Sequence, residues 1–241
     1  MLRKRFVGVK QMEKVGKIEP CTPTDLATFP ALAKAGDGTR AAVAQQSRKW
    51  IVPGNQFLVG AGTLPATLFC IAKGHVNILE QRQEAPALQV DLIGPHTIIG
   101  LGEALLAQPL AYDYVTLSDT EVIATPVSVV APLLETDSRL LFSLLGSLSL
   151  RIHGLVSRIN ALKSLTAEQR LVHHLLDLAA VQSGDGAFTM PYDKKSLAAH
   201  LAVQPESLSR LLKKLRNDGV TIKGNRVQIA DLHHLRTLIS A

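Results

Sequence analysis

The chain has 241 residues, 46% of them hydrophobic, and a formal net charge of +6 at pH 7. That length accommodates two ordinary domains. No apolar run approaches the roughly 20 residues of a membrane helix, and the start lacks the apolar core of a secretion signal, so we expect a cytoplasmic protein. Cys21 and Cys70 are too few for a disulfide scaffold, a four-thiolate zinc site or a four-cysteine iron-sulfur cluster.

The positive charge lies at the two ends of the chain. Residues 1–44 and 163–241 each carry a net charge of +4, whereas residues 45–162 carry −2. A basic C-terminal segment suits a polyanionic partner, because neutralised phosphates release counterions. The basic extension 1–44 is predicted to be a loosely ordered tail, with an arm that binds DNA as the alternative and a short helix over residues 25–35.

Residues 45–135 are predicted to form a sensor domain with an all-β core. Short runs rich in Val, Ile, Leu and Thr alternate with Gly and Pro between residues 46 and 126, which indicates a barrel or sandwich. From residue 127 the period becomes helical, with a short helix over 127–134.

Residues 136–163 are predicted to form one long helix that begins at Thr136 or Asp137. An apolar seam repeats along it at spacings of four and three, as in a coiled coil. The seam comprises Leu141, Leu145, Leu148, Ile152, Leu155, Ile159 and Leu162. We expect it to form a parallel homodimer interface. Burial against the chain's own barrel is the alternative, for which Leu140, Leu144 and Val156 are also available.

Residues 164–241 are predicted to form a winged helix-turn-helix behind a hinge at 164–168. Asp193 can cap a first helix, Ala202 occupies the turn, and Pro205 stands in the first turn of a second helix with a leucine stripe. Any small helical domain can have such a stripe. A hairpin about the Gly224-Asn225 turn favours the winged unit.

This order of elements resembles the CRP/FNR family of bacterial transcription regulators, on the segments LAAHLAVQPESLSRLLKKLRNDGV, KGNRVQIADLHHL and FCIAKGHVNIL. The same segments resemble the branch of the dissimilatory nitrate respiration regulators. The resemblance implies an α+β protein with a cyclic-nucleotide-binding-like β-barrel (jelly roll), a long dimerisation helix and a C-terminal winged helix-turn-helix. It implies double-stranded DNA and RNA polymerase as partners, a homodimer, and no enzymatic activity.

The family reads DNA with an E-x-x-S-R pattern, which falls here on Glu206, Ser209 and Arg210. A carboxylate accepts from cytosine N4 and a guanidinium binds guanine, so a palindromic site with TTGAT-like half-sites is implied. Gln204 and Ser207 stand close enough to assist. The candidates for phosphate contacts are Lys194, Lys195, Lys213, Lys214, Lys223 and Arg226.

The effector pocket departs from the cyclic-nucleotide pattern of the family. Gly102 and Glu103 retain the opening of the phosphate cassette. At the positions where the family has its phosphate-binding Arg-Ser pair, this sequence has Leu110 and Ala111. No Lys or Arg lies between Arg82 and Arg139 to neutralise a phosphate. The adenine-facing positions of the long helix correspond to Leu155 and Val156. A cyclic-nucleotide-responsive regulator is therefore the alternative, and cyclic AMP is not the expected signal.

The identity of the effector stays open. A haem that senses nitric oxide is one hypothesis, with His75, His96, Cys70 and His153 as candidate ligands, and redox sensing is another. A cupin-like metal enzyme is a further alternative, but the barrel has no His-x-His pair with a downstream carboxylate. A ligand-binding module that no longer binds DNA is disfavoured by Arg210 and the basic wing.

Overall fold

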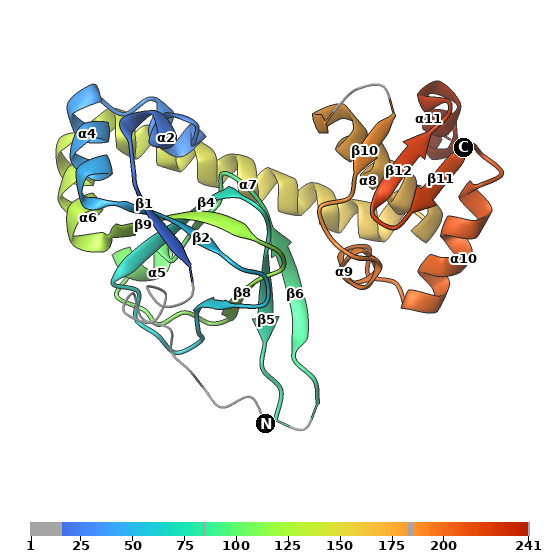
Figure 1. Cartoon of the computed structure of the whole chain (residues 1–241), viewed down its shortest axis with the longest axis horizontal. Coiled ribbons are helices and arrows are strands. Elements are labelled where there is room, and N and C mark those ends of the chain that lie inside the picture. The colour runs from blue at the N-terminus through green and yellow to red at the C-terminus, as the bar shows by residue number, and fades with distance from the viewer. Residues whose placement is uncertain (1–15, 84, 183–185, 241) are drawn as a thin grey trace. The chain divides into compact units, whose positions relative to one another are not determined.

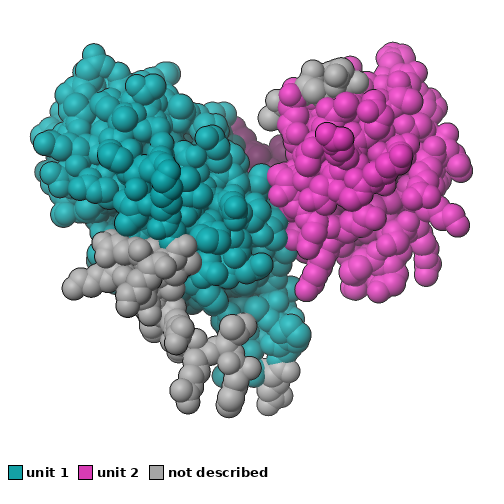
Figure 2. All heavy atoms as spheres, in the orientation of Figure 1, with its two compact units in different colours: residues 1–151 teal, residues 152–241 magenta. Residues whose placement is uncertain are grey.

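The computed structural model describes residues 16–83, 85–182 and 186–240 (Figure 1). They fall into two compact units, residues 1–151 (unit 1) and 152–241 (unit 2), drawn in different colours in Figure 2. The predicted α+β fold is confirmed: a β-barrel, a long helix and a helix-turn-helix with a hairpin follow one another. The predicted DNA arm at the extreme N-terminus lies outside the described residues.

Two antiparallel sheets build the barrel of unit 1. One has the strand order β1-β2-β9-β4-β7 and the other β3-β8-β5-β6. The strands are β1 Lys17–Pro20, β2 Arg48–Val52, β3 Phe57–Val59, β4 Thr67–Lys73, β5 Val76–Glu80, β6 Leu88–Ile93, β7 Ile98–Ile99, β8 Asp113–Thr116 and β9 Thr120–Pro126. A short helix, α5 (Leu101–Leu105), follows β7.

Strand β4 is buried on both faces, which explains its continuous apolar run. Side chains alternate along a strand, so Phe69 and Ile71 enter the core between the two sheets. Leu68 and Cys70 enter a second core, between the first sheet and the helices that cover it. The same division holds on β9, where Val122 belongs to the inner core and Ile123 to the outer one. We call these two groups of side chains the inner core and the outer core.

The prediction of a loosely ordered tail is wrong for the described part of the N-terminal segment. Strand β1 pairs with β2, and three helices follow it: α2 (Pro23–Ala27), α3 (Pro30–Ala33) and α4 (Asp37–Gln46). The single helix expected over residues 25–35 is split, because Pro30 begins a new helix. Leu26 and Phe29 are fully buried in the outer core. Their apolar surface therefore contributes to the stability of the barrel itself.

Helix α6 (Val127–Thr136) and the long helix α7 (Ser138–Ser164) meet at Asp137. Thr136 ends α6, so α7 begins one or two residues later than predicted. The Asp137 carboxylate accepts hydrogen bonds from the first amides of α7 and from Gly36 N and Thr39 Oγ1 at the start of α4, at 2.9 and 2.6 Å. The bonds from Thr39 and Gly36 lower the pKa of Asp137 to about 2.

Helix α7 has one buried stripe and one exposed apolar ridge. Leu140 and Leu144 are buried in the outer core, as one of the sequence alternatives allowed. The seven seam residues Leu141 to Leu162 are between 39% and 58% exposed, and Val156 is exposed beside them. By length and composition α7 could also cross a membrane, contrary to the sequence expectation. Its middle, however, carries Arg151, which pairs with Asp91 of the barrel.

Unit 2 is a helical core with a three-stranded sheet of order β10-β12-β11. Its elements after α7 are α8 Ala167–Gln182, β10 Ala187–Thr189, α9 Lys194–His200, α10 Pro205–Leu215, β11 Val220–Lys223, β12 Arg226–Ile229 and α11 Leu232–Ser240. Thr166 and Gln169 form a capping box at the start of α8. Leu171, Leu197 and Leu215 are completely buried in the centre of the unit.

Candidate DNA interface and effector pocket

Helices α9 and α10 form the helix-turn-helix. Asp193 Oδ1 accepts from Ser196 N at 2.8 Å and so caps α9, as predicted. The turn requires a left-handed residue, and Ala202 adopts it with φ of 54°. Such a conformation is strained for alanine and free of strain for glycine. Pro205 stands at the first helical position of α10, where a missing amide hydrogen removes no helical bond.

Helix α10 buries its leucines and exposes its polar side chains. Leu208, Leu212 and Leu215 are buried and Leu211 is half-buried. The five predicted base-reading residues are all exposed: Gln204, Glu206, Ser207, Ser209 and Arg210. Ser209 donates back to Pro205 O at 3.0 Å. The first turns of α10 thus carry a carboxylate and a guanidinium on a surface supported by a rigid leucine stripe.

The hairpin after α10 places two cations side by side. Strands β11 and β12 pair so that Lys223 stands opposite Arg226, with Gly224 and Asn225 as a two-residue loop. Gly224 has φ of 61°, which suits the first position of a type II′ turn. Both cations are exposed. Like charges opposite each other destabilise a hairpin, so an anion bound between them would be stabilising.

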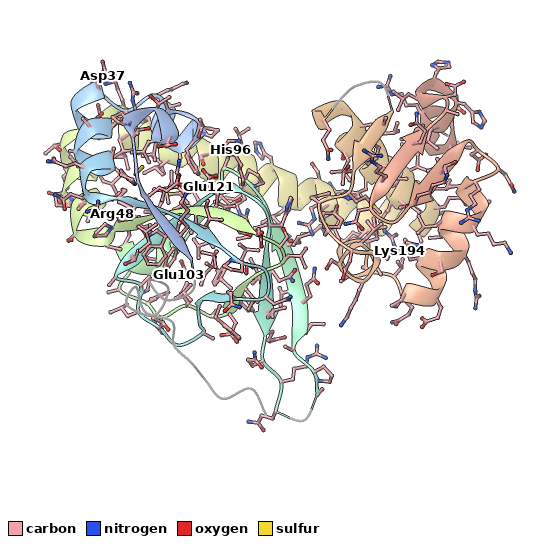
Figure 3. The ribbon with its side chains drawn as sticks, viewed as in Figure 1. Asp37, Arg48, His96, Glu103, Glu121 and Lys194 are labelled. Carbon is pink, nitrogen blue, oxygen red and sulfur yellow. The ribbon has the colours of Figure 1, made fainter. Side chains whose placement is uncertain are left out.

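The other predicted phosphate-contacting lysines differ in their surroundings. Lys194 and Lys195 are exposed in the first turn of α9 (Figure 3 labels Lys194). Lys213 is exposed on α10. Lys214 forms a salt bridge with Glu168 of α8 at 2.6 Å, and this carboxylate raises its pKa. Lys214 therefore fastens α10 to α8 within unit 2.

A cavity of about 560 Å³ opens inside unit 1, between the barrel and α7. Its walls are mostly aliphatic, with isoleucines from β5 to β7 and leucines from α7. Glu103 comes from α5 and His96 from the turn before β7 (Figure 3). Tyr114 lies on the wall, and burial, followed by the nearby Glu103 charge, raises its pKa to about 12. The cavity is an apolar pocket with a few polar groups, the usual form of a small-molecule site.

Of the predicted pocket residues, Gly102 and Glu103 line the cavity. Leu110 is instead buried in the inner core, and Ala111 is exposed outside the cavity. Leu155 and Val156 are exposed on α7, beyond the residues that wall this cavity. Only two of the six sequence positions taken from the family therefore line this cavity.

Sequence reasoning missed Arg151, which lines the cavity from α7 and pairs with Asp91 at 3.6 Å. The spacing of residues along α7 could have predicted the position of Arg151. Arg151 follows Leu144 by seven residues and Leu140 by eleven, so it continues the stripe that packs on the barrel. Arg151 lies beyond the interval between Arg82 and Arg139, which contains no Lys or Arg.

The four candidate haem ligands do not meet. His96 lines the cavity, whereas Cys70 belongs to the outer core and His153 is exposed on α7. His75 lies in the turn between β4 and β5, and burial lowers its pKa. Within the described parts of the chain, no three His, Cys, Asp or Glu residues cluster closely enough to hold a metal ion. These four residues therefore do not together form a haem site.

Two domain families match this architecture. Residues 50–137 match the cyclic nucleotide-binding domain, and residues 169–238 match the Crp-like helix-turn-helix domain. A curated relative from Lacticaseibacillus casei, named "Probable transcriptional regulator flp", is 27% identical over 209 residues, which are 84% of this chain and 92% of the relative.

Solved structures share the fold. A protein from Ruegeria pomeroyi, described as a candidate cyclic nucleotide binding protein, is 25% identical with a TM-score of 0.68 over 91% of this chain and 97% of its own. FixK2 from Bradyrhizobium japonicum is 16% identical, with a TM-score of 0.70 over 81% of this chain and 98% of its own. The regulator CLP from Xanthomonas campestris, described as c-di-GMP responsive, is 21% identical, with a TM-score of 0.64 over 81% of this chain and 100% of its own.

A capped helix pair with an exposed basic reading helix and a hairpin wing defines the class: a DNA-binding transcription regulator with a helix-turn-helix domain. Its combination with a cyclic nucleotide-binding domain settles the family. The chain belongs to the CRP/FNR family of transcriptional regulators. The narrower resemblance to the nitrate respiration regulators stays a prediction.

Proposed function

We propose that the protein is a homodimeric, sequence-specific regulator that reads a palindromic TTGAT-like site with Glu206, Ser209 and Arg210. The observation that carries this proposal is the exposure of all three side chains on α10, whose opposite face is buried. A guanidinium can bind guanine O6 and N7 together, and a carboxylate can accept from cytosine N4. Each good pair contributes about 1 to 3 kcal/mol of discrimination. We also propose that RNA polymerase is a partner of the protein and that the protein is cytoplasmic.

The exposed ridge of α7 supports the homodimer. An apolar seam repeated every three and four residues over this length is the pattern of a two-stranded coiled coil. A second copy would cover the ridge and place two copies of α10 on successive half-sites. Changing Ile152 and Ile159 to Lys should then give monomers in sedimentation, whereas Ser149→Lys, at an exposed position outside the seam, should leave dimers. Dimers of the Ile variant would contradict this interface.

We propose that a small molecule bound in the cavity of unit 1 biases the regulator between DNA-compatible and incompatible states. Its walls are largely aliphatic, and Arg151 is partly neutralised by Asp91. Leu110, at the position of the phosphate-binding Arg of the family, is buried in the inner core. Cyclic AMP is therefore not the proposed ligand. Titration calorimetry with cyclic AMP should show no saturable binding, and micromolar affinity would overturn this part.

Arg210→Ala tests the reading role. The variant should lose about 1 to 3 kcal/mol of preference for the TTGAT-like half-site over a duplex with a changed guanine, measured by fluorescence anisotropy. Lys194→Ala is the matched control, since it removes an exposed cation of α9 and should weaken all duplexes about equally. Unchanged sequence preference in Arg210→Ala, with the dimer intact, would refute the assignment.

A further inference from the structure

Unit 2 holds a cluster of three rings that DNA reading does not use. His174 comes from α8, Tyr192 from the segment before α9, and His200 is the last residue of α9. His174 Nε2 and the Tyr192 hydroxyl share a hydrogen bond. The ring centroids of His174 and His200 are 4.6 Å apart, and those of His174 and Tyr192 5.8 Å. We call these three side chains the ring cluster.

The ring cluster joins α9 to α8. Helix α9 has seven residues, too few to be stable by itself, so its position depends on such contacts. Arg170 of α8 makes a second link, because its guanidinium donates to Leu201 O after α9 and to Leu165 O after α7, at 3.2 and 2.8 Å. The ring cluster and Arg170 together hold the first helix of the helix-turn-helix in place.

The surroundings of the ring cluster are cationic. Arg158 of α7, Arg170 and His173 of α8, and His200 of α9 line the same small cavity of about 110 Å³ as His174. Asp177 is the acidic residue on this wall, and it pairs with His173 at 3.0 Å on the exposed side. The histidines of α11 are engaged elsewhere: their amides bond to Asp231, and His234 lies 3.5 Å from Asp218. A proton added to His174 would therefore meet positive neighbours.

The pKa of His174 is lowered, in agreement with these cationic surroundings. Burial, and then the nearby His200 and Arg158, lower the pKa of His174 to about 3. In an open or unfolded state the imidazole would titrate near its ordinary value of about 6.5. The neutral form is thus favoured in the folded unit. The contribution of neutral His174 to the stability of unit 2 is fully present above pH 6.5 and is lost as the pH falls from there towards 3.

We propose that the ring cluster is a pH-sensitive switch that keeps α9 docked on α8 at neutral pH and releases it in mild acid. Release would free the turn at Ala202 and with it the orientation of α10. The opening equilibrium constant should rise about tenfold for each pH unit below 6.5 through His174 alone. The proposal concerns the stability of unit 2 and stands apart from the DNA sequence that α10 reads.

Hydrogen exchange of the full chain tests the switch. Protection factors of peptides from α8 and α9, which already correct for intrinsic exchange, should fall about tenfold between pH 6 and pH 5 in the wild type. His174→Gln keeps a polar group near Tyr192 but does not titrate, so its protection factors should be nearly independent of pH. His173→Gln, which changes the exposed neighbour, is the matched control and should behave like the wild type. A flat wild-type profile, or an equal fall in His174→Gln, would overturn the proposal.

A second measurement covers the case in which His174→Gln fails to fold. In the wild type, imidazole NMR signals of the form with α9 docked should show His174 neutral down to pH 5. A folded-state His174 that protonates near pH 6.5 would refute the switch. DNA affinity measured over the same pH range separates the two proposals, because loss of protection without any DNA binding would leave the switch standing and contradict only the reading role.

Discussion

The two units are held together in different ways. In unit 1, strands β4 and β9 lie between an inner and an outer apolar core, and the polar contacts at the helix junction converge on one ionised carboxylate, Asp137. In unit 2, the short helix α9 is held by buried leucines and by a titratable ring cluster. A change of pH should therefore affect the stability of the two units in different ranges. Unit 2 should weaken below pH 6.5, whereas Asp137 loses its contribution only between pH 3.8 and about 2.

The largest expected effect comes from the outer core. Phe29→Ala removes a completely buried ring and should lower the unfolding free energy of unit 1 by about 3 to 5 kcal/mol, because a cavity remains. Trp50, the single tryptophan of the chain, is buried in the inner core, so its fluorescence in urea reports unit 1. Phe142→Ala is the control, since Phe142 is 71% exposed on α7. An effect no larger than that of the control would mean that the barrel does not depend on its outer core.

The second prediction concerns the Asp137 carboxylate of unit 1. Asp137→Asn should lower the urea midpoint of Trp50 fluorescence at pH 7, because an amide accepts fewer hydrogen bonds than a carboxylate from Gly36, Thr39 and the start of α7. The folded pKa is below the unfolded value, so the difference from wild type should persist down to about pH 4 and shrink towards pH 2. Glu135→Gln, at an exposed position of α6, should change neither. A constant difference at all pH values would point to packing instead of charge.

The smallest effect concerns the turn of unit 2. Ala202→Gly should raise the stability of unit 2 by up to about 1 kcal/mol, because glycine adopts a φ of 54° without strain. The same change at exposed Ala199, inside α9, should lower stability by about 0.5 to 1 kcal/mol. Protection factors of α9 in hydrogen exchange measure both. Two shifts of the same sign would show that backbone conformation does not govern this turn.

Where the sequence predicted well, the signal was local. Asp193, Ala202 and Pro205 mark the helix-turn-helix within 13 residues, and the Gly224-Asn225 turn marks the hairpin. Where it failed, the deciding contact was distant. Arg151 of α7 lines the same cavity as Ile78 of β5, which lies far earlier in the chain. Phe29 is buried in the outer core with side chains of β4 and β9. The basic composition of residues 1–44 concealed the apolar residues that fold onto the sheet.

The adjacent histidines show the same limit. Residues next to each other on a helix point in different directions, so His173 and His174 have different neighbours. Nothing in the sequence indicated that His174 would meet Tyr192 and His200, 18 and 26 residues further on. His173 instead pairs with Asp177 one turn along α8.

Local signals in the sequence are enough to predict the order of the barrel, the long helix and the winged helix-turn-helix, because capping residues, turn residues and the period of apolar side chains act over a few neighbours. The folded structure was needed to show which charges enter the cavity, which helices cover the sheet and which rings hold α9. Those depend on packing between segments far apart along the chain, which no local period encodes.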